Sequence, residues 1–314
     1  MRKKYLSVAT FLILVLLVTF FSQGCAPQVA QPISGEVVTD DLGREVCLAS
    51  IPQKIISLAP SNTEILFALG LGNRVIGVTE FCNYPPEIET LKLKGQLQII
   101  GGFTNPDFEK IIALNPDLIL ATKIHEKEVI PKLQSRGFTV FALHAENIEE
   151  TLVDIDKVGQ ITGATEQAGE LINQMGEKIT ALEYLVRDLP EVRVLFVTWH
   201  EPLYTAGSGT IPHNLIDRAG GNNIFQDLTG HITVDLEAII NRNPQIILAA
   251  SGHGSAYDKP YTWAKEEPRL AYTAARLNNR VYLIDTDTVS RSGPRLVAAL
   301  EALTRLIHPE VFND

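Results

Sequence analysis

The stretch TNPDFEKIIALNPDLILA (residues 104–121) recurs without a gap as ITVDLEAIINRNPQIILA (residues 232–249), and nine of the eighteen positions are identical. In both copies, an acidic residue precedes apolar residues at helical spacing, and Asn-Pro precedes a short apolar run. Carboxylates favour the positive end of a helix, and the residue before a proline disfavours the helical conformation, so each copy predicts a short helix followed by a buried strand. A repeated unit of this kind predicts two lobes of similar construction.

Strand and helix patterns alternate around the first copy as well. KIISL (residues 54–58) predicts a strand, APSNTE (residues 59–64) leads into a helix that ends at Gly70, and RVIGVT (residues 74–79) predicts another strand. Because this alternation continues to the end of the chain, we expect parallel sheets covered by helices. Residues 147–188 have apolar residues at helical spacing but no sustained heptad, which predicts a long helix between the lobes rather than a coiled coil.

The predicted fold class is α/β, with two lobes that have mainly parallel central sheets and are joined by a single long helix. With 314 residues, the chain is long enough for each lobe to bury its own core. We expect a signal peptide at residues 1–24, a tether at 25–35, an N-terminal lobe at 36–146 that begins with a hairpin, a connecting helical segment at 147–189 and a C-terminal lobe at 190–314.

The composition is that of a globular protein, with 45% hydrophobic and 20% charged residues. The formal net charge is -10. A nucleic-acid partner is not expected, because such binding depends on Lys and Arg side chains that neutralise phosphates. Catalytic motifs such as G-x-S-x-G, a Walker loop or H-E-x-x-H are missing from the sequence, and we do not expect an enzyme.

The amino terminus has the pattern of an export signal. Basic residues at positions 2–4 precede an apolar run at residues 5–21, although a single membrane span is an alternative at this length. The following SQGC (residues 22–25) resembles the lipobox of bacterial lipoproteins, with Ser22 where such motifs usually carry Leu. The resemblance implies that Cys25 is lipidated and holds the protein on the outer side of the cell membrane.

Two cysteines remain after Cys25. Cys47 and Cys82 would both lie outside the cytoplasm, where disulfides persist, and the sequence leaves open whether they pair.

Candidate ligand-binding segments follow several predicted strands. In parallel sheets, ligands bind at the carboxyl ends of the strands. Residues 80–84, 199–202 and 286–291 follow such ends and carry aromatic and polar side chains with few charges. Aromatic and polar side chains with few charges favour a large, partly apolar ligand that carries amide groups over a small anion.

A metal-ion site is an alternative interpretation of the histidines. His200, His231 and His253, with Glu201, are imidazole and carboxylate groups of the kind that bind zinc. The other interpretation is that each histidine makes ordinary hydrogen bonds within its loop.

Three segments point to a known family: KIISLAPSNTE (residues 54–64), GVTEFCNYPPE (residues 77–87) and GGF (residues 101–103). Together they resemble the cobalamin-binding members of the periplasmic binding proteins that serve ABC importers of iron siderophores, haem and cobalamin. The resemblance implies a monomeric protein without a cofactor of its own. Such a protein captures a corrinoid between its lobes and delivers it to a permease dimer with ATPase subunits. Receptors for haem or a ferric siderophore share the first segment and remain alternatives, as does a metal-ion receptor.

The resemblance also assigns ligand contacts. Aromatic positions that enclose the corrin in relatives correspond to Phe81, Phe103, Trp199 and His231, and His231 replaces a tryptophan, which would let it coordinate the ligand metal. Family positions that touch polar groups of the ligand correspond to Asp287 and Arg291, although a pair four residues apart is also a common structural pair. The expected ligand-binding residues are Phe81, Phe103, Trp199, His200, His231, Asp287 and Arg291.

Glu109 and Glu237 occupy matching positions in the two copies of the repeat. In the family, one glutamate on each lobe docks into an arginine pocket of the permease, and these glutamates correspond to Glu109 and Glu237. A carboxylate on each lobe would orient the protein electrostatically on its transporter. The alternative is that both glutamates only complement the positive end of a helix.

Overall fold

A computed structural model describes residues 37–251 and 258–312 of this chain. The predicted signal peptide, the tether with Cys25, and His253 lie outside the described residues. Residues 34–314 form one compact unit. This unit is not divided into lobes, so the lobe and connecting-segment boundaries assigned from the sequence remain predictions.

The N-terminal lobe is built on a five-stranded sheet in which every neighbouring pair is parallel. Three of its strands are buried on both faces, which explains why they appear in the sequence as continuous apolar runs. The predicted strands at residues 54–58 and 74–79 are confirmed. The strand order is β5 (Gln98–Ile99), β4 (Val75–Val78), β3 (Ile55–Ser57), β6 (Leu118–Thr122) and β7 (Val140–Leu143).

Helices cover both faces of this sheet. Ile111 and Leu133, from α4 and α5, pack with Ile56 on one face. Ile65 and Ile88, from α2 and α3, belong to the core on the other face. The helices of this lobe are α2 (Pro60–Ala68), η1 (Gly72–Arg74), α3 (Glu87–Leu93), α4 (Phe108–Leu114), η2 (Lys123–His125) and α5 (Val129–Gln134).

The predicted hairpin at the start of the lobe is confirmed. β1 (Val37–Thr39) pairs antiparallel with β2 (Glu45–Cys47). The turn is fixed by the buried carboxylate of Asp40, which accepts hydrogen bonds from the backbone N–H groups of Leu42 and Ala142. The hairpin is thereby attached to β7 of the sheet.

The C-terminal lobe has a four-stranded parallel sheet and an antiparallel ribbon. The ribbon was not predicted, because residues 199–202 were interpreted as a loop that follows a strand. The sheet has the order β11 (Gly221–Asn223), β8 (Val192–Val197), β13 (Ile246–Ala250) and β14 (Val281–Ile284). The ribbon has the order β12 (His231–Thr233), β10 (Leu203–Ala206) and β9 (Trp199–His200).

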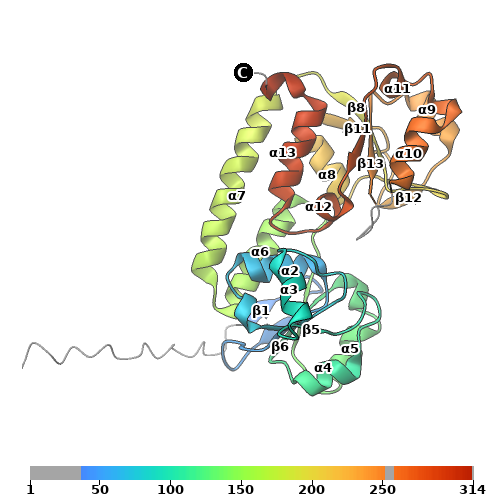
Figure 1. Ribbon diagram of the computed structural model, residues 1–314. Helices are drawn as coiled ribbons and strands as arrows, with labels where there is room; N and C mark the ends of the chain where they lie inside the picture. Colours follow the sequence, from blue (N-terminus) through green and yellow to red (C-terminus); the bar gives the residue numbers. More distant parts are fainter. Residues whose placement is uncertain (1–36, 252–257, 313–314) are drawn as a thin grey trace, which may run out of the picture. The chain divides into compact units, whose positions relative to one another are not determined.

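Helices also flank the second sheet, as Figure 1 shows. Leu215 and Leu300, from α8 and α13, share a core with Leu248 of β13, whereas Ile239 and Ala264, from α9 and α10, belong to another core. The helices are α8 (Ile211–Arg218), α9 (Leu236–Arg242), α10 (Lys259–Glu266), η3 (Pro268–Leu270), α11 (Ala274–Leu277), α12 (Thr286–Ser290), α13 (Leu296–Ile307) and η4 (Pro309–Phe312).

The connecting segment contains two helices where the sequence suggested one. α6 (Ile148–Thr162) ends at Gly163, which has a φ of 71°, and α7 (Thr165–Val186) follows directly. A positive φ at the end of a helix is a conformation that glycine adopts without strain, so the chain turns there. The longer helix, α7, packs against both α6 and α13 (Figure 1).

The internal repeat is confirmed in three dimensions. α4 and α9 each have seven residues, and each ends at an asparagine in the left-handed conformation, with φ of 45° at Asn115 and 44° at Asn243. The buried strands β6 and β13 follow. The copies differ at the residue that precedes the helix, since Asp107 accepts hydrogen bonds from two backbone N–H groups of α4 and Asp235 makes no such cap.

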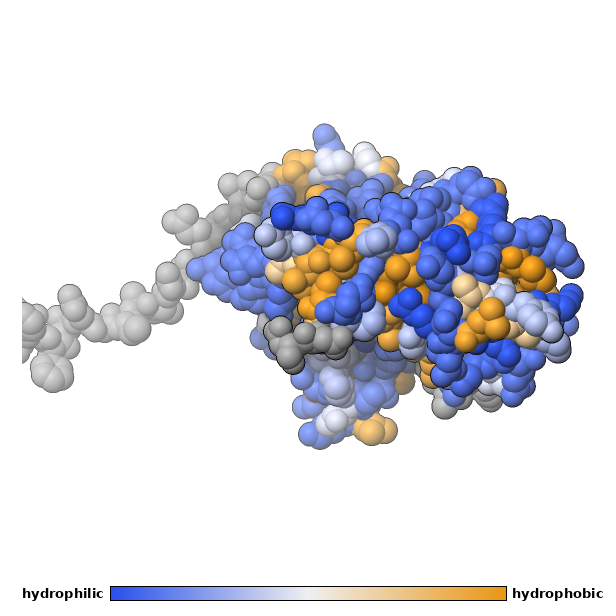
Figure 2. All heavy atoms as spheres, turned by 90° about the horizontal axis from the view of Figure 1, so that it is seen from above, coloured by the Kyte–Doolittle hydropathy of each residue, from blue (hydrophilic) through white to orange (hydrophobic). Residues whose placement is uncertain are grey.

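Hydrophobic side chains concentrate inside the lobes. Figure 2 shows one face of the molecule, where hydrophilic residues (blue) cover most of the surface and hydrophobic residues (orange) form separate areas. Within residues 37–251 and 258–312, no helix combines the length and apolar character that a membrane crossing requires.

Candidate functional site

The loop after β4 presents aromatic side chains on a firmly held backbone. Phe81 is 47% exposed, whereas the neighbouring Cys82 is buried. The Cys82 thiol lies 3.1 Å from Thr63 Oγ1 and 3.2 Å from Thr79 Oγ1. Lys92 Nζ donates to the backbone carbonyls of Glu80 and Cys82. Phe81 therefore projects from a loop that is anchored on both sides of it.

Cys47 and Cys82 do not form a disulfide in the structure. Cys82 is a buried free thiol, and Cys47 is an exposed free thiol on β2. Burial raises the pKa of the Cys82 thiol, although hydrogen bonds from Thr63 and Thr79 lower it in part. Cys82 is thus an inert packing residue of the loop.

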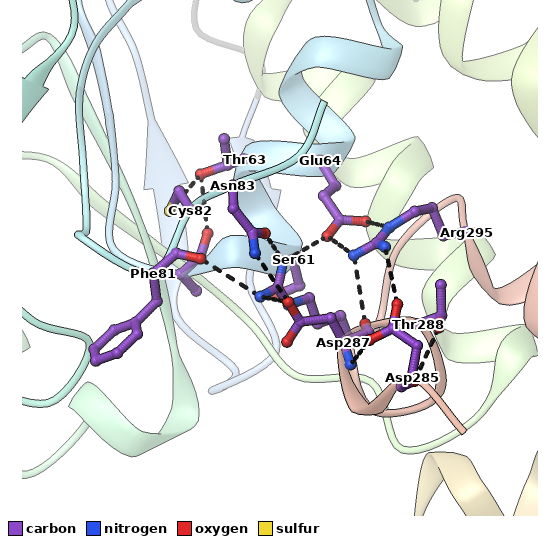
Figure 3. Close-up of polar contacts among 12 residues, drawn as sticks. Ser61, Thr63, Glu64, Phe81, Cys82, Asn83, Asp285, Asp287, Thr288 and Arg295 are labelled. Atoms are coloured by element: carbon purple, nitrogen blue, oxygen red, sulfur yellow. Dashed lines mark hydrogen bonds and ion pairs between the residues drawn. The ribbon is translucent and has the colours of Figure 1, made fainter. Parts of the chain in front are cut away.

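A cluster of charged side chains connects this loop with the C-terminal lobe (Figure 3). Glu64 of α2 has a side chain only 1% exposed, and its carboxylate accepts hydrogen bonds from Arg295 Nε at 2.8 Å and Arg295 Nη2 at 2.7 Å. Arg291 Nη1 donates to the same carboxylate at 3.1 Å. Burial lowers the pKa of Arg295, but its hydrogen bonds to Glu64 and the negative charges of Glu64, Asp285 and Asp287 together raise it more, so the pKa of Arg295 is raised.

Asp287 and Arg291, both predicted as ligand contacts, belong to this cluster. Arg291 Nη2 lies 2.6 Å from Asp287 Oδ2, and its Nη1 donates to Asn83 Oδ1 at 2.7 Å. Asn83 in turn donates to Asp287 at 3.0 Å. The i, i+4 pair is therefore a structural pair in the described molecule, and its two members also contact the N-terminal lobe.

Phe103 is supported by a histidine that the sequence interpretation did not single out. His125 is buried, its Nδ1 accepts from the backbone N–H of Thr122 at 3.0 Å, and its Nε2 lies 2.7 Å from the carbonyl oxygen of Phe103. Burial lowers the pKa of His125 more than these backbone contacts raise it. The neutral ring therefore carries its proton on Nε2 and donates it to Phe103.

Trp199, His200 and His231 lie together on the antiparallel ribbon. Trp199 pairs with Tyr204 on β10, and His231 pairs with Ala206 on the same strand. The rings of Trp199 and His200 have centroids 5.0 Å apart. His200 Nδ1 is buried without a hydrogen-bond partner. The structure thus brings three predicted site residues onto one small element.

The metal-ion interpretation receives no support from the described residues. Across 37–251 and 258–312, no group of three or more His, Cys, Asp or Glu side chains is placed to hold a metal ion. His253, the third histidine of that interpretation, lies outside these ranges.

Glu109 and Glu237 both stand in the first turn of a short helix, α4 and α9, and both are exposed. This equivalent placement in the two copies of the repeat agrees with docking of both carboxylates and with stabilisation of each helix dipole.

Comparison with known proteins places the chain in a family. Residues 55–288 match the family described as Periplasmic binding protein. The chain belongs to this family. A Bacillus subtilis (strain 168) protein described as an uncharacterized ABC transporter substrate-binding lipoprotein is 32% identical over 289 residues, which are 88% of this chain and 87% of that protein.

Two further relatives differ in their ligands. The vitamin B12-binding protein of Vibrio parahaemolyticus serotype O3:K6 (strain RIMD 2210633) is 27% identical over 79% of this chain and 86% of its own length. The apo structure of a periplasmic heme-binding protein from Roseiflexus sp. RS-1 superposes with a TM-score of 0.73 at 27% identity, covering 82% of this chain and 99% of that one. This chain is therefore an extracytoplasmic substrate-binding protein of an ABC transporter, in the family that binds vitamin B12, haem and siderophores.

The sequence interpretation missed several residues of the site. Glu64 and Asn83 lay within quoted motifs but had no assigned role, and Arg295 and His125 were not singled out at all. Arg295 and Glu64 are 231 positions apart, so no local pattern could have paired them.

Proposed function

We propose that this protein captures a corrinoid of the cobalamin type between its two lobes and delivers it to an ABC importer permease. The observation that carries the ligand class is the charge balance of the candidate site. Arg291 and Arg295 are each paired with a carboxylate, from Asp287 or Glu64, so the site offers little net positive charge to an anionic ligand. A corrinoid fits such a site because its rim carries neutral amides, which hydrogen-bond to carboxylates, amides and guanidinium groups alike.

Aromatic side chains support the same ligand class. Phe81, Phe103 and Trp199 would cover the apolar faces of a large ring, and His231 would reach its metal. Haem is the second candidate, favoured by the similarity to the Roseiflexus heme-binding protein. Haem carries two propionate groups, and these carboxylates would compete with Asp287 and Glu64 for the two arginines.

The delivery step and the anchor complete the proposal. Glu109 and Glu237 would dock into basic pockets of the permease dimer with its ATPase subunits. Cys25, which lies outside the described residues, would carry the lipid that holds the protein at the outer side of the cell membrane.

The test is titration of the purified protein with cyanocobalamin, followed by tryptophan fluorescence and thermal unfolding. Haem and a ferric siderophore serve as competitors. We expect saturable quenching and stabilisation by the corrinoid alone, since a ligand that binds only the folded state raises its stability. A shift produced by haem or the siderophore but not by cyanocobalamin would refute the ligand assignment.

A further inference from the structure

The carboxylate of Glu64 is the meeting point of side chains from both lobes. Glu64 belongs to α2 of the N-terminal lobe, whereas Arg291 and Arg295 follow α12 of the C-terminal lobe. Figure 3 shows Arg295 reaching the carboxylate of Glu64 with its guanidinium group. The two hydrogen bonds from Arg295 form a bidentate pair, which fixes orientation as well as distance.

Separation of these groups would be strongly unfavourable. The Glu64 side chain is almost fully buried, so withdrawal of the arginines would leave an uncompensated carboxylate in a low-dielectric environment. The backbone at Gly293 passes close to α2, since a Cβ added there would lie 3.6 Å from Glu64 Cβ. The ion pairs from Arg291 and Arg295 therefore hold a segment that lies directly beside α2.

The cluster continues directly into the candidate ligand contacts. Arg291 contacts Asn83 and Asp287 while it is bound to Glu64, and its Nη2 lies 3.4 Å from the carbonyl oxygen of Phe81. Arg295 lies over the ring of Tyr84, with its guanidinium carbon 4.3 Å from the ring centroid. Loop residues 81–84 of one lobe and Asp287 of the other are thus connected through the two arginines.

We propose that Glu64 is a positioning residue that joins the two lobes and sets the spacing between their ligand-facing groups, acting through Arg291 and Arg295 without contacting the ligand. Its effect on ligand binding rests on the proposed corrinoid function. Its effect on the ligand-free protein does not.

Four variants test this joint in the full-length protein. Glu64→Gln removes the charge, Arg295→Lys keeps a charge but loses the bidentate contact, and the double variant combines them. Glu183→Gln is the control for loss of an arginine-paired carboxylate away from the candidate site, because the partly exposed Glu183 pairs with Arg218, which also pairs with Glu149. Hydrogen exchange is measured without ligand, and the dissociation constant for cyanocobalamin is measured separately.

We expect Glu64→Gln to accelerate amide exchange at residues 80–84 and 285–295 by about tenfold relative to β3 and β6, and to weaken cyanocobalamin binding by at least about tenfold. The double variant should be little worse than either single variant, because both changes open one joint. Glu183→Gln should leave both measurements unchanged.

Unchanged exchange in these two segments of Glu64→Gln would overturn the proposal, as would acceleration spread evenly over the molecule. If Glu64→Gln does not fold, Arg295→Lys decides by the same criteria. If the unmodified protein binds no cyanocobalamin, the corrinoid assignment fails while the exchange measurement still decides whether Glu64 joins the lobes.

Discussion

Asp154 of α6 is a buried carboxyl group that retains its proton near neutral pH. Burial and a hydrogen bond with Asp41 raise its pKa to about 9. Burial also raises the pKa of Asp41. Hydrogen bonds from Asp154, Lys157 and the backbone of His144 lower it by more, so the pKa of Asp41 is lowered overall. The pair therefore holds one proton, which lies on Asp154, and Lys157 balances the charge of Asp41.

This arrangement makes stability depend on pH. Between the unfolded pKa of about 4 and the folded pKa of Asp154, the folded state binds a proton that the unfolded state releases, so stability falls as pH rises through this window. We expect Asp154→Asn to keep a donor to Asp41 and to be more stable than the unmodified protein at pH 8.5 by on the order of 1 kcal/mol.

Urea unfolding at pH 5.5, 7 and 8.5 measures the effect. The stability difference should grow with pH, whereas equal pH slopes for the two proteins would show that Asp154 is ionised in the folded state.

His125 makes stability depend on pH in the opposite sense to Asp154, because its contribution increases as pH rises. Burial lowers its pKa below the unfolded value of about 6.5, so its contribution to stability is complete above that value and is lost as pH falls through the lowered pKa. We expect His125→Phe to destabilise the protein by about 1–3 kcal/mol, because Thr122 N–H and the Phe103 carbonyl lose their partner. His125→Gln, which keeps a donor and an acceptor, should lose less.

The ligand affinity distinguishes support of Phe103 from a general loss of stability. His308 is a second buried histidine, bonded to Gly220 and Glu310, and His308→Phe is the matched control. Cyanocobalamin titration should show weaker binding for His125→Phe and unchanged binding for His308→Phe. Equal affinities would mean that His125 only stabilises the fold.

At the scale of elements, the break between α6 and α7 depends on one glycine. Gly163 has a positive φ, and an L side chain in that conformation costs roughly 1–2 kcal/mol. Gly169 lies within α7 with no atom within 4 Å of an added Cβ, so alanine should fit there and favour the helix. We expect Gly163→Ala to destabilise by about 1 kcal/mol and Gly169→Ala to stabilise by about 0.5–1 kcal/mol.

Denaturant unfolding of the two variants provides the comparison. A Gly163→Ala variant as stable as the unmodified protein would show that the left-handed conformation at Gly163 is not what separates the helices.

Elements with a strong local signal were predictable from the sequence. The repeat places Asp-x-Glu at the start of each helix and Asn-Pro directly after it, and both copies fold as expected. The hairpin at the start of the chain's first lobe and the strands at residues 54–58 and 74–79 were also predicted from local patterns. The break at Gly163 was not predicted, because glycine is tolerated within helices and its φ depends on the fold.

The sequence could nominate candidate site residues only where their position gives a local signal. Phe81 and Trp199 follow the ends of strands, which is where ligands bind in parallel sheets. Arg295 gave no such signal, because its role depends on Glu64 of the other lobe. For the same reason, Asp287 and Arg291 appeared in the sequence as a pair of neighbours, whereas in the structure they are part of a connection between lobes.

For the whole molecule, the repeat implies a pair of equivalent surfaces, one on each lobe. Glu109 and Glu237 are exposed at the start of α4 and α9, and the connection through Glu64 would keep the distance between these helices nearly constant. A fixed distance between two carboxylates is what simultaneous docking on a dimeric permease requires, because a second contact adds affinity only when the geometry allows both.

Transport measurements therefore decide between docking and dipole complementation. We expect Glu109→Ala with Glu237→Ala to bind cyanocobalamin normally but to lose most corrinoid uptake in cells that depend on this protein. Glu87 and Glu166 are exposed first-turn glutamates of α3 and α7, and their joint replacement by alanine is the control. Both double variants remove two helix-dipole contacts of about 0.3–1 kcal/mol each, so their stabilities should match. Loss of uptake in the first variant alone would show that the two glutamates contact the permease, whereas full uptake in both would leave them as helix-stabilising residues.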